Sequence, residues 1–145
     1  MTENEIKAVL PYQKPFLFVD TLTNISEEGI TGSYTFKKDE FFYQGHFKNH
    51  PITPGVILTE VMAQIGVVCL GIYLLRYENL EINAPKIALT SHAIDFFLPI
   101  HPEEKVTVIS EKQYFRFHKL KCKVKMINAK GELVCRGEIA GMISK

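Results

Sequence analysis

Three residues in one stretch of the sequence, FYQGHFKNHPITPGVILTEVMAQ, have types and a spacing that suit acid–base chemistry. His46 lies in a predicted loop, and Glu60 is the single carboxylate in a long apolar run that starts near Gly55. Histidine titrates near neutral pH, so His46 is a candidate general base. Burial among apolar side chains raises the pKa of a carboxyl group, which makes Glu60 a candidate proton donor.

The main-chain amide of Gly55 is the third candidate group. The first N–H groups of a helix have no intrahelical partner, and the helix dipole adds positive charge there. Without a side chain at this position, a carbonyl oxygen can come close and have its negative charge stabilised by the amide. A base, such an amide and an acid together favour proton removal next to a carbonyl, with loss of a β-hydroxyl as water. This reaction needs no metal and no redox cofactor.

Each of the three residues also has an ordinary structural interpretation. Glu60 could bond a neighbouring side chain or pair across a subunit contact, and Gln64 shares its helix face. A lone loop histidine is most often a surface residue, and a Pro-Gly step is most often a turn. His46 and His50 lack clear further ligands, so the sequence predicts no metal site.

The composition favours one soluble domain covering residues 1–145. A net charge of +1 gives no electrostatic argument for nucleic-acid binding. Cys69, Cys122 and Cys135 are odd in number and lack C-x-x-C spacing, which favours reduced thiols in the cytoplasm. The N-terminus shows no signal-peptide pattern, so a cytoplasmic location is expected.

The apolar segment at residues 52–75 is about long enough to span a bilayer. It carries Glu60 and Gln64 near one end, however, and a charge inside lipid is costly. A helix that is apolar all round because it is buried all round is the better interpretation. We therefore expect no membrane span.

The predicted elements surround this central helix. Thr53 is expected to be its N-cap and Pro54 its first residue, and it should end near Tyr77. Strands are predicted at residues 15–22, 29–36, 86–97, 105–117, 119–126 and 132–144, and a short helix at 3–10. The order predicts an α+β protein with an antiparallel sheet packed around the helix.

Strict alternation at residues 119–126 predicts a strand with one apolar face and one lysine face. The lysine row consists of Lys119, Lys121, Lys123 and Lys125. It could attract an acidic carrier protein, although a solvated strand face is the ordinary interpretation.

Four segments, LPYQKPFLFVD, FFYQGHF, PITPGVILTEVMAQ and FLPIHPEEKV, occur in an order that resembles the FabZ-type 3-hydroxyacyl-[acyl-carrier-protein] dehydratases. The resemblance covers nearly the whole chain, and the block from Gly-His-Phe to Ala-Gln is its most specific part. It implies a hot-dog fold, in which a curved antiparallel sheet wraps around one long central helix. It also implies a homodimer, or a trimer of dimers, with active sites at the dimer interface.

The resemblance implies a role for each matched position. His46 would be the base and would face Glu60 of the partner chain, which would be the acid, acting through water. Gln64 would orient Glu60, while the Gly55 amide, with Val56 beside it, would bind the substrate carbonyl. The substrate would be a 3-hydroxyacyl chain on acyl carrier protein. The product would be the trans-2-enoyl thioester of fatty-acid or related polyene or pigment biosynthesis, formed without a cofactor.

Phe96 and Phe97 would line the acyl tunnel, but the sequence departs from the family pattern nearby. Phe97-Leu98 stands where the family has a basic pair, and Lys48-Asn49 follows Gly-His-Phe where Pro-Gly is usual. Two alternatives are a hot-dog acyl thioesterase and a non-catalytic acyl-binding subunit. The presence of both candidate acid–base residues argues against each of them.

Overall fold

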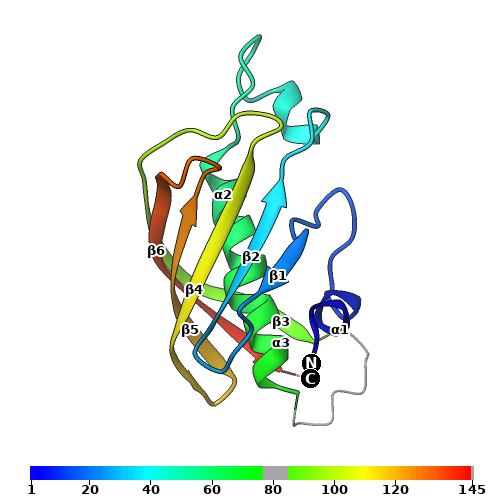
Figure 1. Ribbon diagram of the computed structural model, residues 1–145, viewed down its shortest axis with the longest axis vertical. Helices are drawn as coiled ribbons and strands as arrows, with labels where there is room; N and C mark the ends of the chain where they lie inside the picture. The colour runs from blue at the N-terminus through cyan, green and yellow to red at the C-terminus, as the bar shows by residue number, and fades with distance from the viewer. Residues whose placement is uncertain (77–84, 145) are drawn as a thin grey trace.

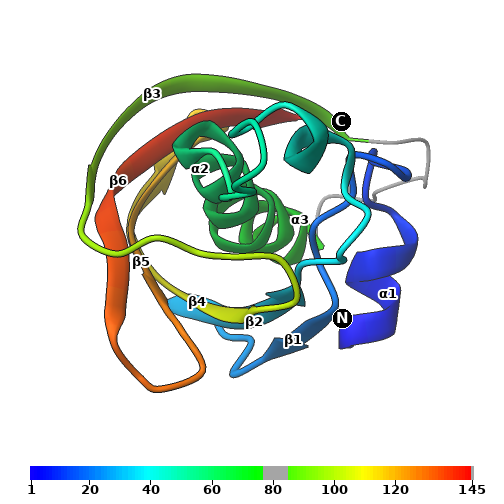
Figure 2. The same cartoon turned by 90° about the horizontal axis from the view of Figure 1, so that it is seen from above.

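A single helix from Gly55 to Leu74 forms the centre of the fold in the computed structural model, which describes residues 1–76 and 85–144. It consists of α2 (Gly55–Ala63), a π-helical stretch η2 (Gln64–Cys69) and α3 (Leu70–Leu74). A curved sheet encloses it from several sides (Figures 1 and 2). The helix is long and apolar enough to cross a membrane, but 83% of its most apolar window is buried inside the protein. Burial against the sheet thus explains its composition without a bilayer.

The described residues form one sheet of six antiparallel strands in the order β1-β2-β4-β5-β6-β3. The strands are β1 (Thr21–Thr23), β2 (Gly29–Thr35), β3 (Lys86–Phe96), β4 (Lys105–Arg116), β5 (Lys119–Ile127) and β6 (Leu133–Ser144). Two short helices, α1 (Glu3–Ala8) and η1 (Phe41–Gln44), lie outside it. The predicted α+β architecture is confirmed, and β3 occupies one edge of the sheet.

Strand alternation decides which side chains face the helix. In β5 the buried residues alternate with the lysine row, and they are Leu120, Cys122, Val124 and Met126. These side chains join the apolar residues of the helix and of the other strands in one continuous core. The burial of one face of β2, β4, β5 and β6 and of most of the helix is the main contribution to the stability of this arrangement.

The predicted strand at residues 15–22 is wrong over most of its length, since β1 contains only Thr21–Thr23. The reason is a side chain of the central helix. Gln64 accepts a hydrogen bond from the Phe18 N–H at 2.8 Å and donates one to the Phe16 carbonyl at 3.1 Å. The amide side chain thus takes the place of a neighbouring strand for this segment.

The predicted start of the helix is also corrected. Pro54 is the N-cap and α2 begins at Gly55, one residue later than expected. The Thr53 hydroxyl does not cap the helix, because it shares a 2.6 Å hydrogen bond with the Tyr43 hydroxyl. At the other end, α3 finishes at Leu74, and the predicted end near Tyr77 lies outside the described residues.

The π-helical stretch lies where the helix touches the sheet most closely. The Ser110 hydroxyl on β4 donates a 2.8 Å hydrogen bond to the Gly66 carbonyl. A Cβ atom at Gly66 would lie 3.1 Å from that of Ser110, so glycine permits the close approach. A π-bulge changes the angular spacing of side chains along a helix, and such bulges are frequent at functional sites.

Candidate active site

Glu60 lies on α2 and lines a cavity of about 210 Å³ between the helix, the N-terminal segment and the edge of the sheet. The lining residues are Tyr12, Phe16, Glu60, Ala63, Val67, Val68, Ile87, Ala88, Leu89 and Gly141. Burial raises the pKa of Glu60, and a hydrogen bond from Gln64 offsets part of that rise. This upward shift of the pKa favours the protonated form of Glu60, which is the form that can donate a proton.

Gln64 is fully buried and fixes the direction of this carboxyl group. Its Nε2 donates to Glu60 Oε2 at 2.9 Å, while its other amide contacts go to the backbone of Phe16 and Phe18. Because the backbone partners determine which end of the amide is oxygen, the N–H toward Glu60 is determined as well. The structure thus brings together the two residues that the helical spacing paired.

His46 lies in the loop that precedes α2, and its ring is oriented by the backbone. His46 Nδ1 is 2.9 Å from the Ile52 carbonyl oxygen. A carbonyl only accepts hydrogen bonds, so Nδ1 carries the proton and Nε2 has a free lone pair. The Ile52 N–H in turn donates to the His46 carbonyl at 2.8 Å, and the Phe47 ring stacks on the imidazole at 4.0 Å between centroids. The imidazole is thereby prepared to accept a proton at Nε2.

Gly55 begins the helix next to an aromatic ring from the edge strand. A Cβ atom at Gly55 would lie 3.3 Å from Phe96, which ends β3 and covers the first turn of α2. The Ile57 and Leu58 N–H groups donate to the Pro54 carbonyl at 2.9 and 3.1 Å, so only the N–H groups of Gly55 and Val56 lack an intrahelical acceptor. A carbonyl oxygen bound to these two amides would lie beside the Phe96 ring, and such main-chain donors can stabilise its negative charge.

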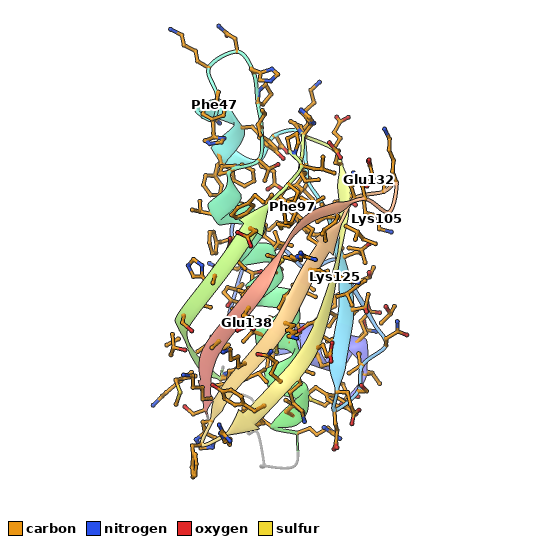
Figure 3. All side chains as sticks on the ribbon, turned by 90° about the vertical axis from the view of Figure 1, so that its left-hand side faces the viewer. Phe47, Phe97, Lys105, Lys125, Glu132 and Glu138 are labelled. Atoms are coloured by element: carbon orange, nitrogen blue, oxygen red, sulfur yellow. The ribbon has the colours of Figure 1, made fainter. Side chains whose placement is uncertain are left out.

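Val56 and Phe97 are placed differently from the other predicted residues. Val56 is 76% exposed and Phe97 is 51% exposed, and neither belongs to the residues that line the Glu60 cavity. The Phe97 ring lies 5.7 Å from the Arg136 guanidinium carbon, toward the outer face of the sheet. Figure 3 shows Phe97 near the end of the edge strand and Phe47 in the loop beyond it, below the tip of that loop. The exposed side chains of Val56 and Phe97 thus form apolar surface near the start of the helix.

His46 and Glu60 of the same chain do not share a cavity, since His46 is absent from the described residues that line the Glu60 cavity. The loop carries His46 before the helix begins, whereas Glu60 lies more than a turn into it. One chain thus places the candidate base and the candidate acid at separate sites.

Two residues of the cavity, Tyr12 and Phe16, were not singled out by the sequence analysis. Their only signal was their position in the LPYQKPFLFVD segment that carries part of the family resemblance. Burial raises the pKa of the Tyr12 hydroxyl, and the charge of Glu60 raises it further. Tyr12 therefore belongs to the electrostatic surroundings of the acid.

No metal-binding group of three or more His, Cys, Asp or Glu side chains occurs among residues 1–76 and 85–144. His50 lies 6.5 Å from His101 between ring centroids, and His101 Nδ1 contacts Glu104 at 3.0 Å. Loop histidines and one nearby carboxylate thus interact at the surface without converging on a common point.

Acidic side chains interrupt the lysine row on the outer face of the sheet (Figure 3). Lys121 pairs with Glu138 at 3.1 Å, and Lys123 lies in register between Glu111 on β4 and Glu138 on β6. The hydrogen bond and charge of Lys121 lower the pKa of Glu138. This mixed pattern favours the solvated-face interpretation over a docking patch for an acidic protein.

Solved structures with the same architecture place the chain in the hot-dog class. The dehydratase heterocomplex ApeI:P from Xenorhabdus doucetiae has a TM-score of 0.81 and 12% sequence identity, and the similarity covers 100% of this chain and 93% of that one. A hypothetical thioesterase with coenzyme A from Streptococcus pneumoniae has a TM-score of 0.59 and 11% identity, over 85% and 84% of the two chains. At these identities the likeness shows the fold, and the predicted hot-dog fold is confirmed.

The chain belongs to the FabA-like domain family, whose model matches residues 10–143. A curated relative, the 3-hydroxyacyl-[acyl-carrier-protein] dehydratase FabZ of Clostridium perfringens, is 41% identical over 70 residues, which is 48% of this chain. The match spans 50% of that relative, so the chain covers about half the length of the curated relatives it matches. The resemblance to FabZ-type proteins inferred from the motifs is confirmed.

Proposed function

We propose that this protein dehydrates a 3-hydroxyacyl thioester to the trans-2-enoyl thioester. The observation that carries the proposal is Glu60, a carboxyl group with a raised pKa in a largely apolar cavity, held by Gln64. The free Nε2 of His46, the amides of the Gly55 turn and the family membership support the same reaction. The curated relatives are named for this activity on acyl carrier protein.

Each group has one task in the reaction. His46 Nε2 removes the proton from the carbon next to the thioester carbonyl, and the Gly55 amide stabilises the negative charge on the carbonyl oxygen. Glu60 protonates the 3-hydroxyl, directly or through water, as the carbon–oxygen bond breaks. The electrons of the broken C–H bond form the new double bond, and water leaves. Gln64 keeps the carboxyl group aimed at the leaving oxygen, and Val56, Phe96 and Phe97 contribute apolar surface to the acyl chain.

A homodimer would complete this site, with His46 of one subunit facing Glu60 of the other. The edge strand β3 supports such pairing, because none of its residues is buried although β4, β5 and β6 each contain several buried residues. Its large apolar side chains Leu89 and Phe96 are 47% and 48% exposed. An exposed edge strand of this length is a template for pairing with another strand. Pairing β3 with its copy would extend the sheet and cover these side chains, and dimers could assemble further into trimers of dimers.

The remaining assignments follow from the same class of protein. We assign residues 1–145 to one dehydratase domain, because the described apolar residues form one continuous core. The partner would be acyl carrier protein, as in the names of the curated relatives. A cytoplasmic location agrees with three buried free cysteines.

The first experiment measures the product from 3-hydroxyacyl thioesters of acyl carrier protein and of coenzyme A. The expected product is the 2-enoyl thioester, formed faster from the carrier protein and lost in His46→Ala. Release of free thiol would instead identify a thioesterase. A folded dimer that binds the thioester but forms neither product would indicate a non-catalytic acyl-binding subunit.

Mixing two inactive variants tests whether the site crosses the subunit boundary. A heterodimer of His46→Ala and Glu60→Gln chains contains one site with both groups intact if they come from different subunits. Random mixing of such chains should then restore about a quarter of the wild-type activity. If both groups act within one chain, the mixture stays inactive, which would contradict the proposed interface site.

A further inference from the structure

Three tyrosine hydroxyl groups have a pKa that burial raises, and only one of them lacks a hydrogen-bond partner in the described structure. Tyr34 donates to Glu40 at 2.5 Å, and the Tyr43 hydroxyl lies 2.6 Å from that of Thr53. No residue in the described part of the chain bonds the Tyr12 hydroxyl. A partly buried phenol without a protein partner is available to a ligand.

The surroundings of Tyr12 indicate what that ligand would contain. Of the ten residues that line the Glu60 cavity, Tyr12 and Glu60 alone carry polar side-chain atoms. The remaining walls are aliphatic, aromatic or glycine. Such a cavity is complementary to a hydrocarbon chain that bears a single small polar group.

Gln64 connects Glu60 to the segment that follows Tyr12. The amide of Gln64 bonds Glu60 on one side and the backbone of Phe16 and Phe18 on the other. Phe16 follows Tyr12 by four residues and lines the same cavity. The buried side chain of Gln64 thus connects the Glu60 carboxyl group to the N-terminal segment that includes Tyr12.

We propose that the Tyr12 hydroxyl donates a hydrogen bond to the 3-hydroxyl oxygen of the substrate and holds it against Glu60. The inference rests on the proposed dehydratase function and adds a substrate-contacting residue to it. During the reaction the oxygen takes the proton of Glu60, leaves carbon 3 with the bonding electrons and departs as water, while the phenol keeps its own proton. Tyr12 would therefore recognise the hydroxyl group in the bound substrate and steady the water that forms.

Binding measurements in a His46→Ala background test this contact without turnover. The probes are acyl carrier protein loaded with a 3-hydroxyhexanoyl chain or with a hexanoyl chain. Tyr12→Phe should weaken binding of the hydroxylated chain by about fivefold to tenfold, the usual effect of losing one hydrogen bond. It should leave binding of the saturated chain unchanged, since the ring remains. Tyr114→Phe, a partly exposed tyrosine on the outer face of β4, is the matched control and should change neither affinity.

The outcomes separate this inference from the proposed function. If the wild type forms enoyl product but adding Tyr12→Phe to His46→Ala changes the affinity for neither acyl chain, the proposed dehydratase function is supported and the Tyr12 contact is overturned. If the wild type forms no enoyl product, the function is overturned, and the comparison of the two chains still decides whether Tyr12 recognises the hydroxyl group. Equal weakening of both chains, or failure of the parent to bind either, would overturn the contact. Unchanged thermal unfolding of Tyr12→Phe is expected because the Tyr12 hydroxyl has no partner among residues 1–76 and 85–144.

Discussion

Glu60 and Glu138 are two glutamates in contrasting regions of the same molecule. Glu60 lies in an apolar cavity beside the central helix, and burial raises its pKa. Glu138 lies on the outer face of β6, where Lys121 lowers its pKa. On the outer face the charges have several neighbours and contact water, so no single charge has a unique task. Inside, the Glu60 carboxyl group has one defined partner, Gln64, and the loss of that partner has no substitute.

The largest expected effect separates the two glutamates by activity. Glu60→Gln keeps the size of the side chain but removes the transferable proton, so turnover should fall by about 100-fold to 10,000-fold. Glu138→Gln should leave turnover unchanged, because the outer face does not contact the cavity residues. Steady-state kinetics of both variants provide the measurement. Equal activity of Glu60→Gln and the wild type would remove the acid from the mechanism.

The second prediction compares the partners of the two glutamates by stability. Gln64→Leu leaves the Phe18 N–H and the Phe16 carbonyl without their bonds, which should cost about 2–4 kcal/mol of unfolding free energy. Lys121→Ala removes an exposed ion pair and should cost less than about 1 kcal/mol. Urea unfolding of both variants tests the difference. Similar losses would mean that the buried amide is no more important than a surface charge.

A third prediction separates activity from stability at the start of the helix. Gly55→Ala places a methyl group 3.3 Å from the Phe96 ring, which is half exposed and can move slightly. The unfolding free energy should change by less than about 1 kcal/mol. Turnover should fall by about tenfold or more, since the methyl group displaces the substrate carbonyl from the amide. Full activity would show that the carbonyl binds elsewhere.

The smallest effect is a difference in the pH dependence of stability. The folded state holds a proton on Glu60 above the ordinary glutamate range, so stability should decrease as the pH rises through its raised pKa. Glu138 has a lowered pKa, so its contribution should decrease as the pH falls through that value. The urea midpoint of each variant is measured across a pH series and compared with that of the wild type. Glu60→Gln should remove a decrease of the midpoint with rising pH, and Glu138→Gln should remove an increase. If the two substitutions changed the slope of the urea midpoint against pH in the same direction relative to the wild type, the contrast between the two regions would be contradicted.

Local sequence patterns were sufficient to predict most of the fold. The alternation in β5 and the apolar run of the central helix each produce one spatial arrangement, because their periods determine which side chains share a face. The segment at residues 15–22 was predicted incorrectly for the opposite reason. Its composition suits a strand, but its hydrogen-bond partner is Gln64, which is 46 residues away from Phe18. Local composition contains no information about a partner so distant in the chain.

The sequence by itself determined the architecture and the helical pair Glu60 and Gln64, since these depend on periodicity and on spacing within one element. Its motifs also indicated the family, through their resemblance to those of FabZ-type proteins. Tertiary structure alone decided that Gln64 also binds the N-terminal segment, that Phe96 covers Gly55, and that Tyr12 shares the cavity of the acid. These contacts join elements far apart in the chain. They arise when the sheet closes around the helix and brings into one small volume side chains whose proximity no sequence period encodes.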